Sequence, residues 1–226
     1  NLPGSTVSVC VPFIAYLAWG RQYDYTHLAQ SADYLYIMDY DDNTQIWDSQ
    51  CMARANSGYL TTQRGVQSYL NLGIDPSKLI LGVPWYGKQY PCLVEEMDGG
   101  VTGKYCPIHP DNTRGVNCSD FVAQEIPYGA IMNRVLTEKW NITEIRWDDT
   151  QKAPFVNVDG HDQSNNMLQY WYDNPESLIW KYKYAKSMGL RGLGPFQFGD
   201  EWYDHSDTEK ERAQELWSAF DAFYLD

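Results

Sequence analysis

Aromatic and acidic residues follow two short apolar segments of the chain. The first segment ends at Met38 and leads into Tyr40 and Asp41, and the second leads into Trp85 and Tyr86. Flat, amphipathic aromatic rings stack on the faces of sugars, and they also serve as ordinary core and interface residues. In a barrel of parallel strands, the carboxyl ends of the strands carry the active site. The pattern therefore indicates a pocket at two strand ends, with carbohydrate binding as one chemistry it could perform.

Alternating strand-like and helix-like segments must position these residues. Short apolar or β-branched runs predict four buried strands, at residues 6–11, 34–38, 79–83 and 190–196. Apolar residues on one helix face, or residues that cap helices, predict helices at 25–31, 61–72, 174–189 and 208–224. The first of these is a short helix or a turn. Strand-helix-strand alternation is typical of parallel βα units, so the chain belongs to the α/β class.

The segment between residues 88 and 170 interrupts this alternation. It holds Gly99-Gly100, several prolines, three of the five cysteines and both Asn-x-Ser/Thr sequons. A simple connection between a strand and a helix is much shorter than this. We therefore expect an inserted α+β subdomain that is stapled by disulfides and contains one helix within residues 127–136.

The four predicted βα units are too few for a closed barrel. A complete (β/α)8 barrel needs eight units and typically about 250 residues, whereas this chain has 226 residues. A lone sheet of four parallel strands would expose two long edges. We expect the missing N-terminal half of the barrel to lie on a segment upstream, in the same protein or in a separate chain.

The composition excludes several classes of partner and cofactor. The formal net charge of -13 argues against nucleic acid, because an acidic surface repels phosphate backbones. No apolar run is long enough to cross a bilayer. The sequence has no phosphate-binding glycine loop, no His-Glu-x-x-His motif and no calcium loop. Four histidines stand in polar surroundings, at positions 27, 109, 161 and 205. We therefore expect no metal and no cofactor.

The cysteines and sequons together indicate an oxidising compartment. The chain has five cysteines and no Cys-x-x-Cys pair, which argues against a zinc site or a thioredoxin-like motif. Sequons at Asn117 and Asn141 predict glycosylation of a secreted, luminal or lysosomal protein with disulfides. Cys92 and Cys106 bracket one loop and are expected to pair. The remaining connectivity is open, and one cysteine is left over.

Three motifs in this order resemble family-18 glycoside hydrolases, the chitinase-like sugar-cleaving barrels. They are Met38-Asp39-Tyr40-Asp41, the run KLILGVPWYG at 78–87, and YDNPES at 172–177 followed by YAKSMGLRG at 184–192. The resemblance implies a (β/α)8 TIM barrel, of which this chain supplies roughly the last four βα units plus the insertion. The implied divisions are barrel strands five to seven in 1–87, the inserted subdomain in 88–170, and the last barrel helix, strand eight and closing helix in 171–226.

The resemblance also implies substrate-assisted retaining hydrolysis of N-acetylglucosamine oligosaccharides, from glycoprotein glycan cores or chitin. In this family the 2-acetamido oxygen of the sugar attacks its own anomeric carbon while a glutamic acid protonates the leaving oxygen. Tyr40 would donate its hydroxyl to the acetamido oxygen, and Asp41 would hydrogen-bond the sugar beside the scissile bond. Both are therefore candidate catalytic residues. A capped strand end is the alternative explanation of this pair.

Four further residues are candidate substrate-binding residues by the same resemblance. Met38 would form the floor of the pocket, Trp85 and Tyr86 its wall, and Phe196 a surface on which the sugar stacks. For Trp85 and Tyr86 the alternative is core packing between strand and helix. The cysteines whose placement also resembles such enzymes, and which are candidates for disulfides, are Cys51, Cys92, Cys106 and Cys118.

Several features depart from the family pattern. The acidic signature Asp-x-x-Asp-x-Asp-x-Glu, which carries the catalytic acid, is absent from these residues and is expected upstream. Pro195-Phe196 stands where the family usually places Trp, and Asp39 adds a carboxylate where a small residue is common. The alternative function is therefore that of an inactive family-18-like protein, which binds glycan or forms part of an extracellular or luminal assembly.

Overall fold

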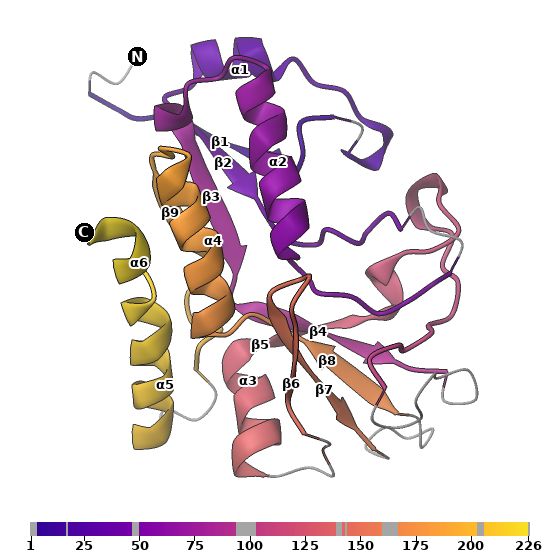
Figure 1. Ribbon diagram of the computed structural model, residues 1–226. Coiled ribbons are helices and arrows are strands. Elements are labelled where there is room, and N and C mark those ends of the chain that lie inside the picture. The colour runs from indigo at the N-terminus through magenta and orange to yellow at the C-terminus, as the bar shows by residue number, and fades with distance from the viewer. Residues whose placement is uncertain are drawn as a thin grey trace.

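The computed structural model describes residues 4–16, 18–46, 50–93, 103–138, 142, 144–159, 167–202 and 206–225. Within these ranges the strands form two sheets, one of four strands and one of five. In Figure 1 the parallel sheet occupies the upper half of the molecule and the antiparallel sheet the lower half. No helix in these ranges is long and apolar enough to span a membrane.

The four-stranded sheet is entirely parallel, in the order β1-β2-β3-β9. Its strands are β1 (Ser8–Pro12), β2 (Tyr34–Met38), β3 (Leu79–Pro84) and β9 (Gly192–Phe196). The register places Met38 opposite Gly82 and Pro84 opposite Phe196. The carboxyl ends of β2, β3 and β9 therefore lie beside one another.

The five-stranded sheet is antiparallel, in the order β5-β4-β8-β7-β6. Its strands are β4 (Tyr86–Pro91), β5 (Gln124–Pro127), β6 (Arg146–Asp148), β7 (Ala153–Val158) and β8 (Leu168–Trp171). Only Trp85 separates the end of β3 from the start of β4. The chain thus passes from one sheet straight into the other at the residues that the sequence assigned to a pocket.

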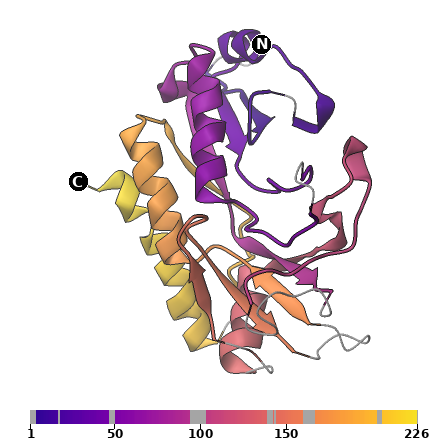
Figure 2. The ribbon, with the colours of Figure 1, turned by 45° about the vertical axis from the view of Figure 1, so that its right-hand side comes forward.

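Helices cover one face of the parallel sheet, except the helix at Tyr128–Met132, which packs against the antiparallel sheet. They are α1 (Tyr25–Ser31), α2 (Tyr59–Asn71), α3 (Tyr128–Met132, continued by a π-helical turn at Asn133–Thr137), α4 (Pro175–Ser187), α5 (Asp207–Ser218) and α6 (Asp221–Tyr224). Figures 1 and 2 show α2 and α4 side by side on the sheet, with α5 and α6 packed along α4. Helix α4 begins with a capping box, in which the side chains of Asn174 and Ser177 each accept the other's backbone N–H.

The alternation of side chains along the strands explains why the helices pack here. One core cluster joins the sheet to these helices, and its members without exposed surface include residues of β2 (Leu35, Ile37), β3 (Leu79, Leu81, Val83), α2 (Val66, Tyr69) and α4 (Leu178, Tyr182, Ala185). Successive residues of a strand point to opposite faces, so every second residue meets the helices. Burying one such side chain contributes about 1.5–3 kcal/mol, which makes this cluster a principal source of stability.

The opposite face of the parallel sheet is organised around Tyr36. Its ring lies over Gly82 of β3 and Gly194 of β9, where an added Cβ would approach ring atoms to 2.3 and 2.6 Å. The Tyr36 hydroxyl donates a hydrogen bond to the Gly194 carbonyl oxygen at 2.8 Å. Both glycines are therefore required by the close approach of this ring rather than by their backbone angles.

One predicted element is wrong in its extent. The sequence predicts a single closing helix over 208–224, but the structure divides this segment into α5 and α6. The break at Ala219 and Phe220 lets the Phe220 ring stack on Tyr182, with centroids 5.1 Å apart. Packing against α4 thus outweighs the continuation of the helix.

We predict that Gly82→Ala destabilises the protein by about 1–3 kcal/mol, because the new methyl group displaces the Tyr36 ring from its contact with Gly194. Urea unfolding of the two proteins measures the difference. In the background Tyr36→Ala the same substitution should be neutral or slightly stabilising, since Ala is preferred to Gly in a strand when space is available. Equal costs in the two backgrounds would contradict this explanation.

Candidate functional site

The candidate site lies where three parallel strands end. Tyr40 and Asp41 follow β2, Tyr86 follows β3, and Phe196 is the last residue of β9. Backbone hydrogen bonds hold these ends together. The Trp85 N–H donates to the Phe196 carbonyl at 2.8 Å, and the Asp39 N–H donates to the Gly82 carbonyl at 3.0 Å. The structure therefore brings together four residues that the sequence singled out from segments far apart in the chain.

Three aromatic rings surround the site. The Tyr40 and Phe196 rings are stacked with centroids 5.1 Å apart, and the Tyr86 ring meets them edge-on at 6.1 and 6.3 Å. Tyr40 and Tyr86 are buried, whereas 43% of Phe196 is exposed. Phe196 is thus the ring that remains accessible to a ligand. It opens onto a depression of about 190 Å³ that Tyr86, Glu125 and Asp200 also line.

The carboxylate of Asp41 lies at the centre of a polar cluster. Its Oδ1 accepts a hydrogen bond from the Tyr86 hydroxyl at 2.8 Å and lies 2.8 Å from the Lys88 ammonium. The Asp41 N–H donates to Asn56 Oδ1 at 3.0 Å. The backbone of Asp41 is left-handed, with a φ of 55°, which is uncommon for a non-glycine residue and is typical of functional positions. These contacts hold the carboxylate in one orientation.

Lys88 forms ion pairs with several acidic groups at the site. Its ammonium lies 2.8 Å from Asp41, 3.2 Å from Glu125 and 3.7 Å from Asp120. Burial alone would lower the pKa of Lys88, but the carboxylates of Asp120 and Asp41 outweigh burial and raise it. Burial raises the pKa of Asp120 to about 6, against the opposing effect of Lys88. Lys88 therefore remains a cation and fixes the charge next to Asp41.

The two tyrosines act as hydrogen-bond donors. Burial raises the pKa of Tyr40 far above its usual value, and the neighbouring Tyr36, Cys10 and Asp41 raise it further. Burial and the Asp41 carboxylate raise the pKa of Tyr86 in the same way. Both phenols thus keep their protons over the whole physiological range. The Tyr40 hydroxyl can stabilise a partial negative charge that develops on a ligand oxygen.

Two other predicted binding residues occupy different positions. Met38 is half-buried at the end of β2, two residues before Tyr40. Trp85 is only 1% exposed, and its ring packs edge-on against Trp217 at 4.8 Å. The Trp85 side chain therefore lies in the core, as in the core-packing alternative, because it precedes Tyr86 by one residue and points to the other side. Its backbone still supports the site through the bond to Phe196.

The sequence analysis missed four residues that contact the site, namely Lys88, Asn56, Glu125 and Asp120. For Lys88 a signal exists, because a strand places residues i and i+2 on the same face and Lys88 follows Tyr86 by two residues. Asn56, Glu125 and Asp120 reach Asp41 or Lys88 only through tertiary folding of the loop after β2 and of the insertion. Among the described residues, no group of three or more His, Cys, Asp or Glu could hold a metal ion.

A buried polar network lies directly behind the site. Asp39 Oδ2 accepts hydrogen bonds from Thr62 at 2.7 Å and from Ser57 at 3.0 Å. The Lys181 ammonium donates to Ser57 at 2.8 Å and to both carboxylate oxygens of Asp173 at 2.7 and 2.8 Å. All five residues are almost completely buried. This network connects the end of β2 to α2 and α4.

The network contains more buried acid than base. Lys181 is one cation, while Asp39, Asp42 and Asp173 are three carboxyl groups. Burial raises the pKa of Asp39 to about 6, although Lys181 and two hydroxyl donors oppose the shift. Burial and the neighbouring Asp39 also raise the pKa of Asp42 well above its usual value. At least one of these carboxyl groups therefore holds a proton under mildly acidic conditions.

Two disulfides staple the loops around the site. Cys92 pairs with Cys106, the pair that the sequence analysis expected, and Cys51 pairs with Cys118 across 67 positions. Cys10 on β1 is exposed and unpaired. At the sequon of Asn117 the asparagine is exposed, whereas Ser119 has no exposed surface. The predicted glycosylation site at Asn141 lies outside the described residues.

Comparison with known proteins relates the chain to a family of glycosyl hydrolases. Residues 5–201 match the family model for glycosyl hydrolases family 18. Among curated proteins, the di-N-acetylchitobiase of Mus musculus is 37% identical over 219 residues, which cover 97% of this chain and 57% of that protein. The di-N-acetylchitobiase of Homo sapiens is 36% identical over 197 residues, which cover 87% of this chain and 48% of that protein. The chain spans about half the length of these relatives.

Solved structures show the same fold. A chitinase from Chromobacterium violaceum superposes with a TM-score of 0.67 at 18% identity, covering 99% of this chain and 56% of its own. A family-18 chitinase from Cycas revoluta, in complex with (GlcNAc)3, gives a TM-score of 0.64 at 21% identity, covering 96% and 55%. The chain therefore has the α/β fold of these chitinases over about half of their length.

We predict that Asp39→Asn removes a pH-dependent component of stability. A folded-state pKa of about 6 lies above the unfolded value, so the contribution is complete below about pH 4 and is lost as the pH rises through 6. The variant should therefore gain about 1–3 kcal/mol relative to the wild type between pH 5 and pH 8. Urea unfolding at both pH values measures this gain.

The matched control is Asp149→Asn, because the Asp149 side chain is 89% exposed. This control should follow the wild type at both pH values. If Asp39→Asn and the wild type lose stability in parallel from pH 5 to pH 8, Asp39 does not hold the proton.

Proposed function

Because the chain belongs to glycosyl hydrolase family 18, on the match of residues 5–201, we propose that it forms part of a chitobiase-like glycoside hydrolase. The substrate class is N-acetylglucosamine oligosaccharides, from glycoprotein glycan cores or chitin. The observation that carries this proposal is the convergence of Tyr40, Asp41, Tyr86 and Phe196 at the carboxyl ends of β2, β3 and β9. The chitobiase names of the relatives at 36–37% identity support it.

The proposed reaction is substrate-assisted hydrolysis with retention. The acetamido carbonyl oxygen attacks the anomeric carbon, the glycosidic bond breaks, and a glutamic acid gives its proton to the leaving oxygen. Water then opens the oxazolinium ring and restores the acetamido group. Tyr40 hydrogen-bonds the acetamido oxygen and orients its attack, and a well-oriented intramolecular attack lowers the barrier by about 7–11 kcal/mol. Asp41 binds the sugar beside the scissile bond, and its negative charge stabilises the oxazolinium.

The general acid comes from outside this chain in this proposal. The family's Asp-x-x-Asp-x-Asp-x-Glu signature is absent from its 226 residues. In the part of the chain that the structure describes, β1 and β9 each pair on one side only, which supports closure by further strands. We assign the chain to roughly the last four βα units of a (β/α)8 barrel, with the remaining half on the same protein or on a separate chain.

The disulfides support a location in an oxidising compartment. Two disulfides are typical of proteins that fold in oxidising surroundings. We assign the protein to a secreted, luminal or lysosomal location. The sequon at Asn117 is consistent with that route, because its asparagine is exposed.

A second candidate function is glycan binding without catalysis, within an extracellular or luminal assembly. The observation that favours it is Phe196, which stands where the family usually places a tryptophan. Phenylalanine has a smaller face and no indole N–H, so it holds a distorted sugar less firmly. An upstream segment in which the catalytic glutamate is replaced would decide for this function.

The test is hydrolysis of a fluorogenic diacetylchitobioside by the complete protein, before and after Tyr40→Phe. We expect the wild type to turn over with retention, and we expect the variant to lose about 100–1,000-fold in kcat. Calorimetric binding of N-acetylglucosamine oligomers should change only a few-fold, because the lost hydrogen bond strengthens mainly in the transition state. Tyr16→Phe is the control, since Tyr16 is 57% exposed.

The outcomes separate the two candidate functions. If the wild type does not hydrolyse the substrate but still binds the oligomers, the hydrolase proposal is wrong and glycan binding without catalysis is favoured. An equal loss of binding and turnover in Tyr40→Phe would show that Tyr40 has only a structural role.

A further inference from the structure

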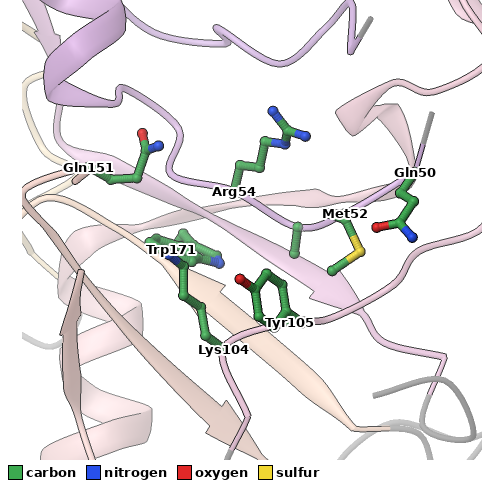
Figure 3. Close-up of a pocket in the computed structure, with 8 residues that line it drawn as sticks. Gln50, Met52, Arg54, Lys104, Tyr105, Gln151 and Trp171 are labelled. Carbon is green, nitrogen blue, oxygen red and sulfur yellow. The ribbon is translucent and has the colours of Figure 1, made fainter. Parts of the chain in front are cut away.

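One cavity outside the candidate site lies beside the antiparallel sheet. It measures about 410 Å³, and Figure 3 shows residues that line it, among them Arg54, Lys104 and Trp171. Both of these cations are engaged within the protein, because Lys104 pairs with the carboxylate of Asp148 and Arg54 also has a partner.

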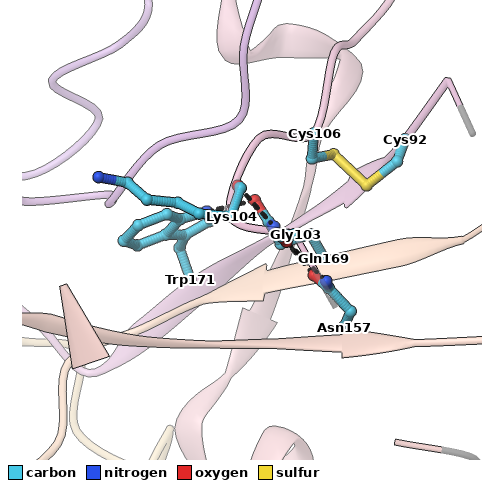
Figure 4. The surroundings of a disulfide bond; sticks show 7 residues. All are labelled: Cys92, Gly103, Lys104, Cys106, Asn157, Gln169 and Trp171. Carbon is cyan, nitrogen blue, oxygen red and sulfur yellow. Dashed lines mark hydrogen bonds between the residues drawn. A yellow bond between two sulfur atoms is a disulfide. The ribbon is translucent and has the colours of Figure 1, made fainter. Parts of the chain in front are cut away.

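The backbone along this cavity is engaged in the same way. The Asn157 amide donates to the Gly103 carbonyl at 2.9 Å (Figure 4). The Gln169 amide donates to the Lys104 carbonyl at 3.0 Å and to Asn157 Oδ1 at 2.9 Å. Buried amides that bind a backbone in this way hold it in one conformation. These polar groups therefore fix the segment that leads to Cys106.

A groove over α2 and α4, the helices that Figures 1 and 2 show side by side, differs in this respect. It measures about 400 Å³, within the range of small-molecule sites, roughly 300–1,000 Å³. None of its lining residues lines the depression beside Phe196. The lining includes Tyr16, Gln63, Arg64, Gln67, Asn71 and Tyr184.

One wall of the groove is the segment that follows β1. The Ala15 N–H donates to the Ser68 hydroxyl oxygen at 2.8 Å. The segment passes so close to α2 that a Cβ added at Gly65 would lie 2.0 Å from the Phe13 carbonyl oxygen. Tyr16 comes directly after these contacts and is 57% exposed. The chain is thus fixed to α2 at the point where it presents the Tyr16 ring to the groove.

A second wall is Tyr184 on α4. Its hydroxyl donates to the Gln63 carbonyl at 3.3 Å, and its ring meets the Tyr59 ring edge-on at 6.2 Å. Tyr59 in turn meets Trp180, which is 42% exposed, at 5.9 Å. Aromatic rings of this kind contact the apolar faces of sugars. Because both walls are held by the fold, the groove is preformed and loses little conformational entropy on binding.

Helix α2 contributes a pair of linked amides to the lining. Gln67 and Asn71 are exposed and one turn apart, so they lie on the same face of the helix. Gln67 Nε2 donates to Asn71 Oδ1 at 2.9 Å. An acceptor, Gln67 Oε1, and a donor, Asn71 Nδ2, remain without a partner among the described residues. Two neighbouring hydroxyl groups of a sugar, each of which both donates and accepts, match this pair.

Arg64 adds further donors on the same face of α2. Its side chain is exposed and has no hydrogen bond or ion pair within the part of the chain that the structure describes. No carboxylate is among the described residues that line the groove. A lining of amides, phenols and one guanidinium favours a hydroxyl-rich, neutral ligand, because a guanidinium donates several hydrogen bonds in fixed directions.

We propose that this groove binds a neutral hexose unit of a glycan through two vicinal hydroxyl groups. The linked amides of Gln67 and Asn71 bind the two hydroxyls, and Arg64 donates to a further sugar oxygen. The rings of Tyr16 and Tyr184 contact the apolar face of the hexose. In a 1,4-linked chain of N-acetylglucosamine, an internal unit has an acetamido group at C2 and a linkage at O4, so it has no vicinal hydroxyls. The groove therefore recognises a sugar other than the proposed substrate.

The test is a titration of the complete protein with methyl α-glucoside and its 2,3-dideoxy analogue, which differ only in two hydroxyl groups. Methyl α-mannoside and methyl β-galactoside form further arms. We expect at least one of the three hexosides to bind about tenfold or more tightly than the dideoxy sugar. No binding of any hexoside, or equal affinities of all four sugars, would overturn the proposal. Inorganic sulfate that binds as tightly as the best hexoside would show an anion site and would also overturn it.

Variants locate the binding. Asn71→Ala should weaken binding of the best hexoside about tenfold. Gln214→Ala is the matched control and should change nothing, because Gln214 is exposed on α5 and donates to Ser218 one turn further on at 3.3 Å. A hexoside affinity that Asn71→Ala leaves unchanged would overturn the assignment.

Hydrolysis of the diacetylchitobioside, measured in parallel, separates this proposal from the proposed function. The rate should be the same in the wild type and in Asn71→Ala, and the hexoside should not inhibit it. Competitive inhibition by the hexoside would place its binding at the candidate site and overturn the assignment to the groove. If the wild type does not hydrolyse the substrate, the hexoside titration still tests the groove by itself.

Discussion

The buried ammonium group of Lys181 is the contact on which the geometry of the candidate site depends. It binds Asp173, which joins β8 to α4, and Ser57, which precedes α2 and donates to Asp39 at the end of β2. One cation thus ties together two helices, the last strand of the antiparallel sheet and the strand that carries Tyr40 and Asp41. Removing one partner of a buried ion pair costs about 3–5 kcal/mol, because the other charge is left without compensation. Lys181 has no exposed surface, so water cannot replace it.

This network also fixes the positions of Tyr40 and Asp41. Asp39 is the residue directly before them, and its side chain points into the network while theirs point into the site. The left-handed backbone of Asp41 then turns the carboxylate toward Tyr86 and Lys88. A sugar bound by these residues would therefore rest on a surface that is held from behind by hydrogen bonds rather than by loops alone. Such preorganisation is what transition-state stabilisation requires.

Local pattern predicted the parallel half of the fold well. Residues 25–31 and 34–38 form α1 and β2 with the expected bounds, because apolar strands and capped helices there agree with their tertiary surroundings. The split between α5 and α6 depends on the contact of Phe220 with Tyr182, which no local pattern contains. The strands of the antiparallel sheet pair residues far apart, such as Lys88 with Trp171. For this region the sequence predicted an α+β insertion, one helix and the Cys92–Cys106 disulfide, but not the order or pairing of the strands.

The candidate site shows the same division. Tyr40, Asp41 and Tyr86 belong to motifs at the ends of predicted strands, and Phe196 ends the last predicted strand, so the reasoning from strand ends predicted that these four residues lie together. Trp85 stands beside Tyr86 in the same motif, yet strand alternation buries one and brings the other into the site. The two buried cations that hold the site, Lys88 and Lys181, belong to no recognisable sequence motif. A buried lysine can be identified only from the carboxylates that folding brings around it.

The sequon at Asn117 sets an order of events during synthesis. Its Ser119 is fully buried in the folded loop, and the residue between them is Cys118, which is bonded to Cys51. A transferase must reach both the asparagine and the hydroxyl of its sequon, and the folded loop withholds the hydroxyl. Any glycan on Asn117 must therefore be attached while the chain is still unfolded and Cys118 is still reduced. Rapid oxidation would then yield molecules without that glycan, so the occupancy of Asn117 records which of the two reactions came first.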